Sequence, residues 1–359
     1  MKGEVVYLYA FDVANEIVTA RVQEILSEKP FPFEIRVDHT FPKDVPLYRP
    51  LAIQPSSLPG TVHHQPARVE IRVYDVGVVA IAMRVDFEVG RLTDLMPFHE
   101  GKLDSGKPLD AIARELCAQV CDSLRSAMVR SEPPTAPEAY TSFCITGLDS
   151  ERDTNRWLTE ERRAVAGLLT GTDPNRLSEA QIGEVLRVQR SYEVTDLVVI
   201  DWDAALIVDL TGYVDDALYV LELANLQLEE FRVMDRKLDG YLNRVFEDLD
   251  RSQLPFSGGT GPVLRTLRRF RVDVARLADE VSNITKFFGD WHLARVYLGA
   301  RDRFYLDQWR QSVQQRLEQL DRLYSVLSGE LYDRRMLLLE LIIVVLFVID
   351  VVGLFVLKR

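Results

Sequence analysis

Two short segments contain residue types that ligand-binding sites use. Residues 258–262, Gly-Gly-Thr-Gly-Pro, have the glycine content of a phosphate-binding loop, but they lack the lysine and the following Ser or Thr that hold phosphate and magnesium. A flexible connection between helices is the favoured interpretation. Asp201 and Asp203 flank a tryptophan at a predicted hairpin tip, where two carboxylates can hold a hard cation. Turn aspartates more often bond their own backbone, so a structural role is favoured there as well.

The histidines and cysteines do not complete a metal site by their spacing. His63 and His64 are adjacent in a proline-rich stretch, and no ligand spacing relates them to the other histidines, His39, His99 and His292. Cys117 and Cys121 lie one helical turn apart, which could form half of a metal site, but no second pair or nearby histidine completes it. Two small buried side chains are the favoured interpretation. No metal and no cofactor is predicted.

No motif of a known catalytic mechanism occurs in the chain. A nucleophile elbow, a paired-histidine helix and a cysteine-histidine set are all missing from the sequence. The sequence therefore favours a protein that is not an enzyme. A site assembled from distant residues stays open, so a membrane-tethered enzyme with its site in the α+β part is one alternative.

Composition excludes one class of partner and indicates a compartment. The net charge of −12 and the pI near 5.1 argue against direct DNA binding, which needs a clustered positive surface. The three cysteines are too few for a disulfide scaffold and suit a reducing compartment.

The end of the chain is an almost unbroken apolar run. Residues 336–357 match the roughly 20 residues that cross a bilayer as one helix. Basic residues flank the run on both sides, and the N-terminus has no signal peptide pattern. The sequence therefore predicts a single-pass, tail-anchored protein of the inner (cytoplasmic) membrane, with the N-terminal domain in the cytoplasm and the lipid bilayer as a partner.

Two acids and a glycine mark this run. A carboxylate costs about 2.5 to 3.5 kcal/mol at mid-bilayer, so such a residue usually has a reason. Glu340 falls near the start of the run and Asp350 lies deeper, while Gly353, about one turn on, would let another helix approach closely. Glu340, Asp350 and Gly353 are therefore predicted to support association of tail helices. A proton or ion path through Asp350 in an oligomer is the second alternative.

Upstream, the hydrophobic pattern predicts an α+β fold that repeats one unit. Residues 1–132 follow the order strand, helix, strand, strand, helix, with a proline-rich loop at 41–66. A similar order follows in residues 138–212. We interpret the two as a duplicated split βαββα (ferredoxin-like) unit that packs helices on antiparallel sheets.

Residues 213–335 change to long helices with heptad spacing, which predicts a three-helix antiparallel coiled-coil stalk. The apolar positions of the second and third helices alternate three and four residues apart. These seam positions are Leu267, Phe270, Val274, Leu277, Val281, Ile284, Phe288, Val313, Leu317, Leu320, Tyr324, Leu327 and Leu331.

Three stretches resemble the required-for-meiotic-nuclear-division family. They are the hairpin Asp-Leu-Val-Val-Ile-Asp-Trp-Asp-Ala-Ala at 196–205, the segments at 218–223 and 232–239, and the tail at 335–352. In the tail, Leu341 stands where the family has tryptophan, and Asp350 where it has its second acid. None of these motifs is catalytic.

This resemblance implies a membrane-anchored protein that forms homo-oligomers. Mitochondrial relatives at the inner membrane support organelle translation, and ribosome tethering is one interpretation of their role. A cytoplasmic protein or ribosome partner is thus an expectation that the resemblance supplies. Together with the patterns above, it predicts a membrane-anchored homo-oligomeric scaffold or tethering protein that exposes an α+β domain.

Overall fold

The computed structural model describes residues 1–25, 31–32, 50–131, 133–134, 136–148, 153–210, 213–251, 271–272, 275 and 290–357. The chain divides into two compact units. Unit 1 comprises Met1–Arg232 and Glu280–Trp309, and unit 2 comprises Val233–Asp279 and Arg310–Arg359. Each unit is described by itself.

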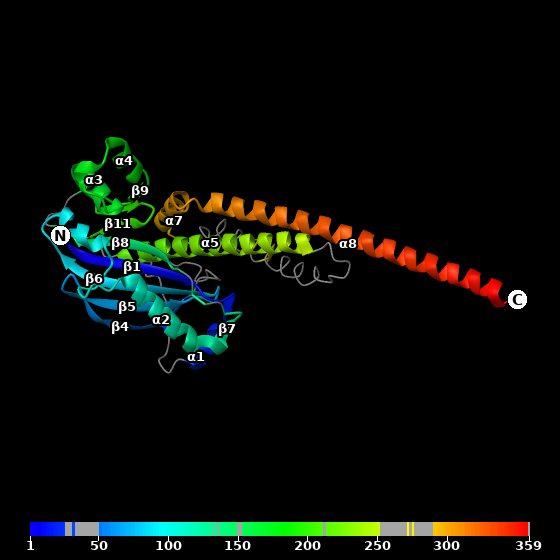
Figure 1. Cartoon of the computed structure of the whole chain (residues 1–359). Coiled ribbons are helices and arrows are strands. Elements are labelled where there is room, and N and C mark those ends of the chain that lie inside the picture. The colour runs from blue at the N-terminus through cyan, green and yellow to red at the C-terminus, as the bar shows by residue number, and fades with distance from the viewer. Residues whose placement is uncertain are drawn as a thin grey trace. The chain divides into compact units, whose positions relative to one another are not determined.

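Unit 1 is an α+β fold around one large mixed sheet, seen as the layer of arrows in Figure 1. Nine strands are hydrogen-bonded in the order β3-β4-β5-β6-β1-β8-β11-β10-β9 within the described residues. Their bounds are β1 Lys2–Asp12, β3 Phe31–Pro32, β4 Leu51–Val62, β5 Gln65–Val73, β6 Val78–Glu88, β8 Glu138–Gly147, β9 Gln189–Arg190, β10 Asp196–Ile200 and β11 Ala204–Asp209. A second, two-stranded sheet pairs β2 Glu16–Ile17 with β7 Met128–Val129.

The helices fall in the connections and after the sheet. Those of unit 1 before the long helices are α1 Thr19–Ile25, α2 Leu109–Leu124, α3 Thr154–Thr170 and α4 Glu179–Val185, with the 3-10 helices η1 Leu92–His99, η2 Arg125–Ala127 and η3 Pro174–Arg176. The remaining helices are α5 Val214–Arg251, α7 Trp291–Arg303 and α8 Leu306–Leu357. Local sequence sets their ends: Asp153 caps α3 by accepting from Asn155 and Arg156.

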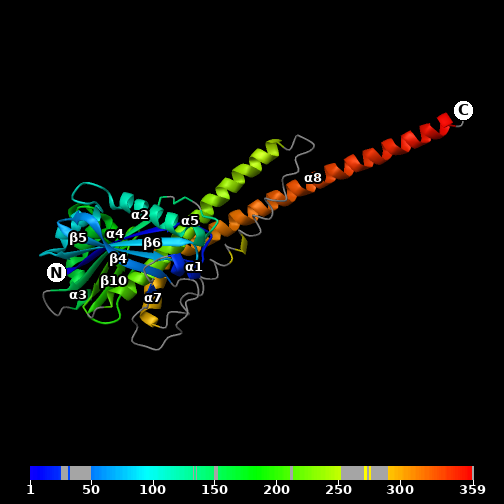
Figure 2. The ribbon, with the colours of Figure 1, turned by 90° about the horizontal axis from the view of Figure 1, so that it is seen from below.

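Strand β1 lies at the centre of the sheet and is buried on both faces. Every residue from Val5 to Phe11 is buried, and alternate side chains of a strand point to opposite faces. Tyr7, Tyr9 and Phe11 join the main apolar core with side chains of α2, η1 and α3. Helix α2 packs against β1 and β6, as Figure 2 shows.

The opposite face of the sheet is covered by α5 and α7. Val6 and Leu8 of β1 line a small cavity together with Leu218 and Leu221 of α5. Helix α7 packs against β9 and β10. One face of an antiparallel sheet is often left to solvent, but here both faces are covered, and charged residues on the second face are therefore enclosed.

The two predicted repeats share strand order but not strand direction. In the first half, β1 neighbours β6 and β6 neighbours β5, all antiparallel. In the second half, β8 neighbours β11 and β11 neighbours β10 in the same order, but β8 pairs with β11 in parallel. Both halves join one sheet through the antiparallel pair β1 and β8. The second half therefore does not have the pairing of a split βαββα unit.

The predicted loop at 41–66 differs from the structure in its second part. Residues 41–49 lie outside the described residues, but β4 occupies 51–62 and begins a hairpin with β5. Prolines lack the donor that a ladder needs, and here the pairing shifts register between Ile53 and Ser56 and again between Ser57 and Thr61. These irregularities accommodate Pro55 and Pro59 within the strand.

Unit 2 pairs the later part of α5 with α8. Arg316 of α8 forms ion pairs with Asp235 (3.1 Å) and Asp239 (2.6 Å) of α5. Val313, Leu317 and Leu320 are buried on α8, as are Val233 and Leu238 on α5. Tyr324, Leu327 and Leu331 belong to α8, but their side chains are not described. The seam positions of the second predicted helix lie outside the described residues: Leu267, Phe270, Val274, Leu277, Val281, Ile284 and Phe288.

The predicted single transmembrane helix at 336–357 is wrong. In the portion of the chain that the structure describes, no helix has the length and apolar character needed to cross a membrane. The prediction was based on apolar composition, but the run includes the carboxylate of Glu340, and a carboxylate costs about 2.5 to 3.5 kcal/mol at mid-bilayer. The terminal element of the predicted fold class, the description as a tail-anchored membrane protein and the single-pass inner-membrane location are corrected accordingly.

Candidate functional site

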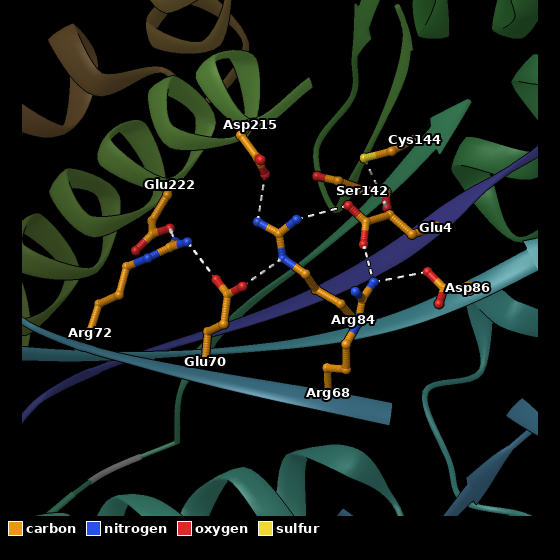
Figure 3. Close-up of polar contacts among 10 residues, drawn as sticks. All are labelled: Glu4, Arg68, Glu70, Arg72, Arg84, Asp86, Ser142, Cys144, Asp215 and Glu222. Carbon is orange, nitrogen blue, oxygen red and sulfur yellow. Dashed lines mark hydrogen bonds and ion pairs between the residues drawn. The ribbon is translucent and has the colours of Figure 1, made fainter. Parts of the chain in front are cut away.

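A network of charged side chains lies on the sheet face that α5 covers (Figure 3). Arg68, Glu70 and Arg72 alternate along β5, so all three side chains leave the same face. The register places Ala82 opposite Glu70 and Ala80 opposite Arg72 on β6. These small neighbours leave room for the longer charged chains, which reach toward α5.

The inner end of the network is a buried triad. The Arg72 guanidinium donates to the Glu222 carboxylate of α5 and, at 2.8 Å, to Glu70. The hydroxyl of Tyr74, which follows β5, donates to the second oxygen of Glu222 at 2.6 Å. Arg72, Tyr74 and Glu222 are each 5% exposed or less. A buried carboxylate is stable only when paired and hydrogen-bonded, and Glu222 has both kinds of partner.

Arg84 of β6 holds the outer part of the network together. Its guanidinium lies 2.8 Å from Glu4 of β1, 3.3 Å from Glu70 and 2.7 Å from Asp215 of α5. Arg68 adds ion pairs to Glu4 (3.1 Å) and to Asp86 on β6 (2.9 Å); Arg68 and Asp86 are exposed, whereas the Glu4 side chain is only 15% exposed. The chain of contacts therefore links three strands to one helix.

Burial sets the proton affinities of this network. Desolvation raises the pKa of Glu4 above its ordinary value, although Arg84 and Arg68 act in the opposite direction. Burial, followed by the charge of Glu222, raises the pKa of Tyr74 far above its usual range. Tyr74 therefore remains a hydrogen-bond donor at all physiological pH values.

The space inside the network is too small for a substrate. Arg72, Arg84, Ser142 and Glu222 line a cavity of ≈ 20 Å³. A cavity of that size has room for about one water molecule, whereas small-molecule sites occupy roughly 300–1,000 Å³. The network can fasten α5 to the sheet, but it cannot hold a metabolite.

A larger hollow lies on the surface between η1, α3 and η3. Its volume is ≈ 610 Å³, and Glu160, Glu161, Arg163 and Asp173 contribute its charges. Arg163 donates to the carbonyls of Pro174 and Leu177, and Asp173 caps η3 through the Asn175 amide. Those two polar groups therefore serve the local fold.

Asp201 of the predicted hairpin tip belongs to a second buried ion pair. The Arg303 guanidinium of α7 donates to Asp201, with Nε at 2.9 Å, and to Glu184 at 2.7 Å. Asp201 and Arg303 are both buried. The carboxylate that was a candidate cation ligand with Asp203 thus neutralises an arginine.

The adjacent histidines form a tight turn. His63 and His64 both have positive φ, 47° and 64°, which suits the two central positions of the β4–β5 hairpin turn. The Asp104 carboxylate accepts from the Thr61 hydroxyl (2.6 Å) and the His64 amide (2.9 Å). Their position is explained by the turn.

The three cysteines lie in two places. Cys117 and Cys121 face each other on α2, and Cys144 is buried in β8. The hydrogen bond between the first two raises the pKa of Cys117 and lowers that of Cys121. Within the described residues, no group of three or more His, Cys, Asp or Glu side chains could hold a metal.

The predicted association residues belong to unit 2, and their role stays a prediction. Glu340 is exposed on α8, while Asp350 and Gly353 belong to α8 with side chains that are not described. The network itself was missed in the sequence. The sequence pattern that indicates the network is the alternation of Arg68, Glu70 and Arg72 in a predicted strand. The same pattern is equally typical of a strand face exposed to solvent.

Comparison with known proteins gives a family without an assigned activity. Residues 2–215 match the family described as "Uncharacterized protein MJ0711, N-terminal domain". The Uncharacterized protein MJ0711 of Methanocaldococcus jannaschii is 24% identical over 238 residues, covering 66% of this chain and 72% of that protein. No solved structure matches. Nothing in these matches links the chain to the required-for-meiotic-nuclear-division family, so that resemblance stays a prediction.

Proposed function

Because the chain belongs to the MJ0711 N-terminal domain family, whose description states no activity, we propose a function from geometry: the protein is a homo-oligomeric scaffold whose copies associate through α8. The single observation that carries this proposal is the exposure of the apolar residues on that helix. The sheet-bearing unit would be the part that the assembly displays.

Apolar side chains are exposed on every side of α8 between Met336 and Ile349. Each apolar residue described in this stretch is between 45% and 70% exposed. Consecutive residues of a helix point about 100° apart, so no single face accounts for the set. Apolar area in water is unfavourable by about 25 cal/mol per Å², and patches of this kind mark interaction surfaces.

A second copy is the occupant that the chain itself offers. The preceding part of α8 already packs in heptad spacing, with Val313, Leu317 and Leu320 buried. Because the exposed residues surround the helix, a packing of more than two helices would cover them better than a pair. The scaffold interpretation also agrees with the α5 network, whose acids and arginines bond one another and leave no room for a substrate.

The experiment compares assembly of three proteins by light scattering after gel filtration and by sedimentation velocity, in mild non-ionic detergent to keep apolar surfaces dispersed. The full chain should form a defined oligomer. Phe347→Glu, at the most exposed position of the stretch, should shift it toward monomer. Gln315→Glu, on an exposed polar position of the same helix, should leave the oligomer intact. A full chain that is monomeric at all concentrations, or equal masses for the full chain and Phe347→Glu, would contradict the proposal.

A further inference from the structure

We propose that Cys117 and Cys121 form a binding site for a soft, thiophilic metal ion of the Cu(I) class. The two residues occupy positions i and i+4 of α2, so they share one face of the helix. Their sulfur atoms lie 4.0 Å apart. This site is independent of the scaffold function.

The separation of the sulfurs fits a shared metal. With metal–sulfur bonds of about 2.3 Å, two sulfurs on one tetrahedral ion lie about 3.8 Å apart, and two on a linear ion about 4.6 Å apart. The observed separation falls between these limits, so either geometry needs a shift of only a few tenths of an ångström. A disulfide would need the sulfurs to approach to about 2.05 Å. The sulfur separation on the helix is therefore closer to that of two ligands on one metal ion than to that of a disulfide bond.

The site has an enclosed side and an open side. Cys117 is fully buried in the apolar core, and Cys121 is partly exposed against it. An ion can arrive at Cys121 from solvent and engage Cys117 behind it.

The donor set selects the class of ion. Among the described residues no further His, Cys, Asp or Glu joins this pair to make a three-ligand group. Zinc in structural sites takes four ligands, whereas Cu(I) is selected by thiolates and accepts few of them. Binding replaces both S–H protons with sulfur–metal bonds, so two protons are released to solvent and the oxidation state of the ion does not change.

The test is an anaerobic titration of the reduced full chain with Cu(I) against a chromogenic Cu(I) chelator. The wild type should withdraw one Cu(I) per chain from the chelator. Cys121→Ser, at the partly exposed position, should lose this stoichiometry, while Cys144→Ser, at the third cysteine, should keep it. Circular dichroism melting of each variant shows that it is folded.

A second readout does not depend on a variant. Alkylation by iodoacetamide followed by mass spectrometry should label Cys121 in the metal-free protein, and one equivalent of Cu(I) should protect it. The proposal is overturned if folded Cys121→Ser binds Cu(I) as the wild type does, if Cys144→Ser loses binding equally, or if Cu(I) leaves the alkylation of Cys121 unchanged.

Discussion

Arg72 of β5 and Glu222 of α5 form a buried ion pair between residues 150 positions apart in the chain. Both side chains are almost inaccessible to solvent, at 6% and 4% exposure. Tyr74 and Glu70 supply the additional hydrogen bonds that such a pair needs. The pair fixes where α5 lies along the sheet, because a shift of the helix by one turn would separate the charges by about 5.4 Å.

Removal of one member of this pair should be strongly destabilising. Glu222→Gln leaves the Arg72 charge buried without its main partner, and the expected loss is about 3–5 kcal/mol in the free energy of unfolding. Asp122→Asn, which removes an exposed partner of Arg125, should cost about 1 kcal/mol or less. Urea unfolding of both variants measures the difference. Equal losses of stability in the two variants would show that the Arg72–Glu222 pair does not hold α5 on the sheet.

Tyr74→Phe isolates the hydrogen bond to Glu222 from the charge of the pair. The variant keeps the ring and removes one donor to a buried carboxylate, so the expected cost is about 1.5–3 kcal/mol. Tyr192→Phe is the matched control, since Tyr192 is 72% exposed, and it should change stability by less than about 0.5 kcal/mol. Thermal unfolding by calorimetry compares them. If Tyr74→Phe is as stable as the control, the Tyr74 hydroxyl does not contribute to the stability of the buried pair.

Local patterns in the sequence were enough to predict two hairpins of unit 1, β5–β6 and β10–β11, but not the β4–β5 hairpin. In the sequence, residues 69–74 alternate apolar and polar side chains, residues 75–77 have turn character and residues 78–87 are largely apolar, which predicts the hairpin formed by β5 and β6. The apolar runs at 195–201 and 204–210 in the same way predict the hairpin formed by β10 and β11. In each case a short turn joins strands that pair locally. Hairpin pairing depends on neighbours in sequence, which is why pattern alone finds it.

Long-range pairing could not be predicted in the same way. The parallel contact of β8 and β11 joins residues about 60 positions apart through two helices, and nothing in either strand states the direction of pairing. The same holds for Arg68, Glu70 and Arg72. The charged face of such a strand normally lies in solvent. Here the face is in the interior because α5, which begins at Val214, packs over it.

Apolar character alone led to the wrong terminal element. The composition of residues 336–357 predicts a spanning helix, but among the described residues no helix combines the length and the apolar character that crossing a membrane requires. Prolines led to the opposite error in β4, where local register shifts absorb residues that argue against a strand.

Glu4 should make the free energy of unfolding depend on pH. Burial raises its pKa above the ordinary 4.5, so the folded state holds the proton more tightly than the unfolded state. Its stabilising contribution is therefore full below the unfolded pKa and is lost as pH rises through the raised folded pKa. Relative to Glu4→Gln, the wild type should lose free energy of unfolding over that rise. Glu88→Gln, at an exposed position of β6, should follow the wild-type profile in urea unfolding across pH. A constant difference between wild type and Glu4→Gln would refute the assignment.

Arg303→Met tests the second buried pair. The variant keeps an apolar chain of similar length but leaves Asp201 buried without its guanidinium, and the expected loss is about 3–5 kcal/mol. Arg187→Met removes a more exposed arginine with longer contacts to Glu184 and Asp302 and should cost about 1 kcal/mol or less. Amide hydrogen exchange should show faster exchange in α7 and at the β10–β11 turn for Arg303→Met only. Unchanged protection there would mean that Arg303 does not hold α7 to the hairpin.

Gly77→Ala should show how strictly the β5–β6 turn limits the backbone. Gly77 has φ of +93°, and its carbonyl accepts from the amides of Val13 and Ala14. A Cβ added there would meet the Ala14 carbonyl oxygen at 1.8 Å, so the turn must move away from β1 or strain. The backbone conformation alone costs on the order of 1–3 kcal/mol.

Gly183→Ala is the matched control, and it is expected to change stability in the opposite direction. No heavy atom lies within 4 Å of a Cβ at Gly183, and this residue is inside α4, where alanine is favoured by roughly 0.5–1 kcal/mol. The free energy of unfolding, measured by chemical denaturation, should therefore be higher than wild type for Gly183→Ala and lower for Gly77→Ala. Only Gly77 is required, because its φ is positive and the Ala14 backbone, just after β1, lies close to it.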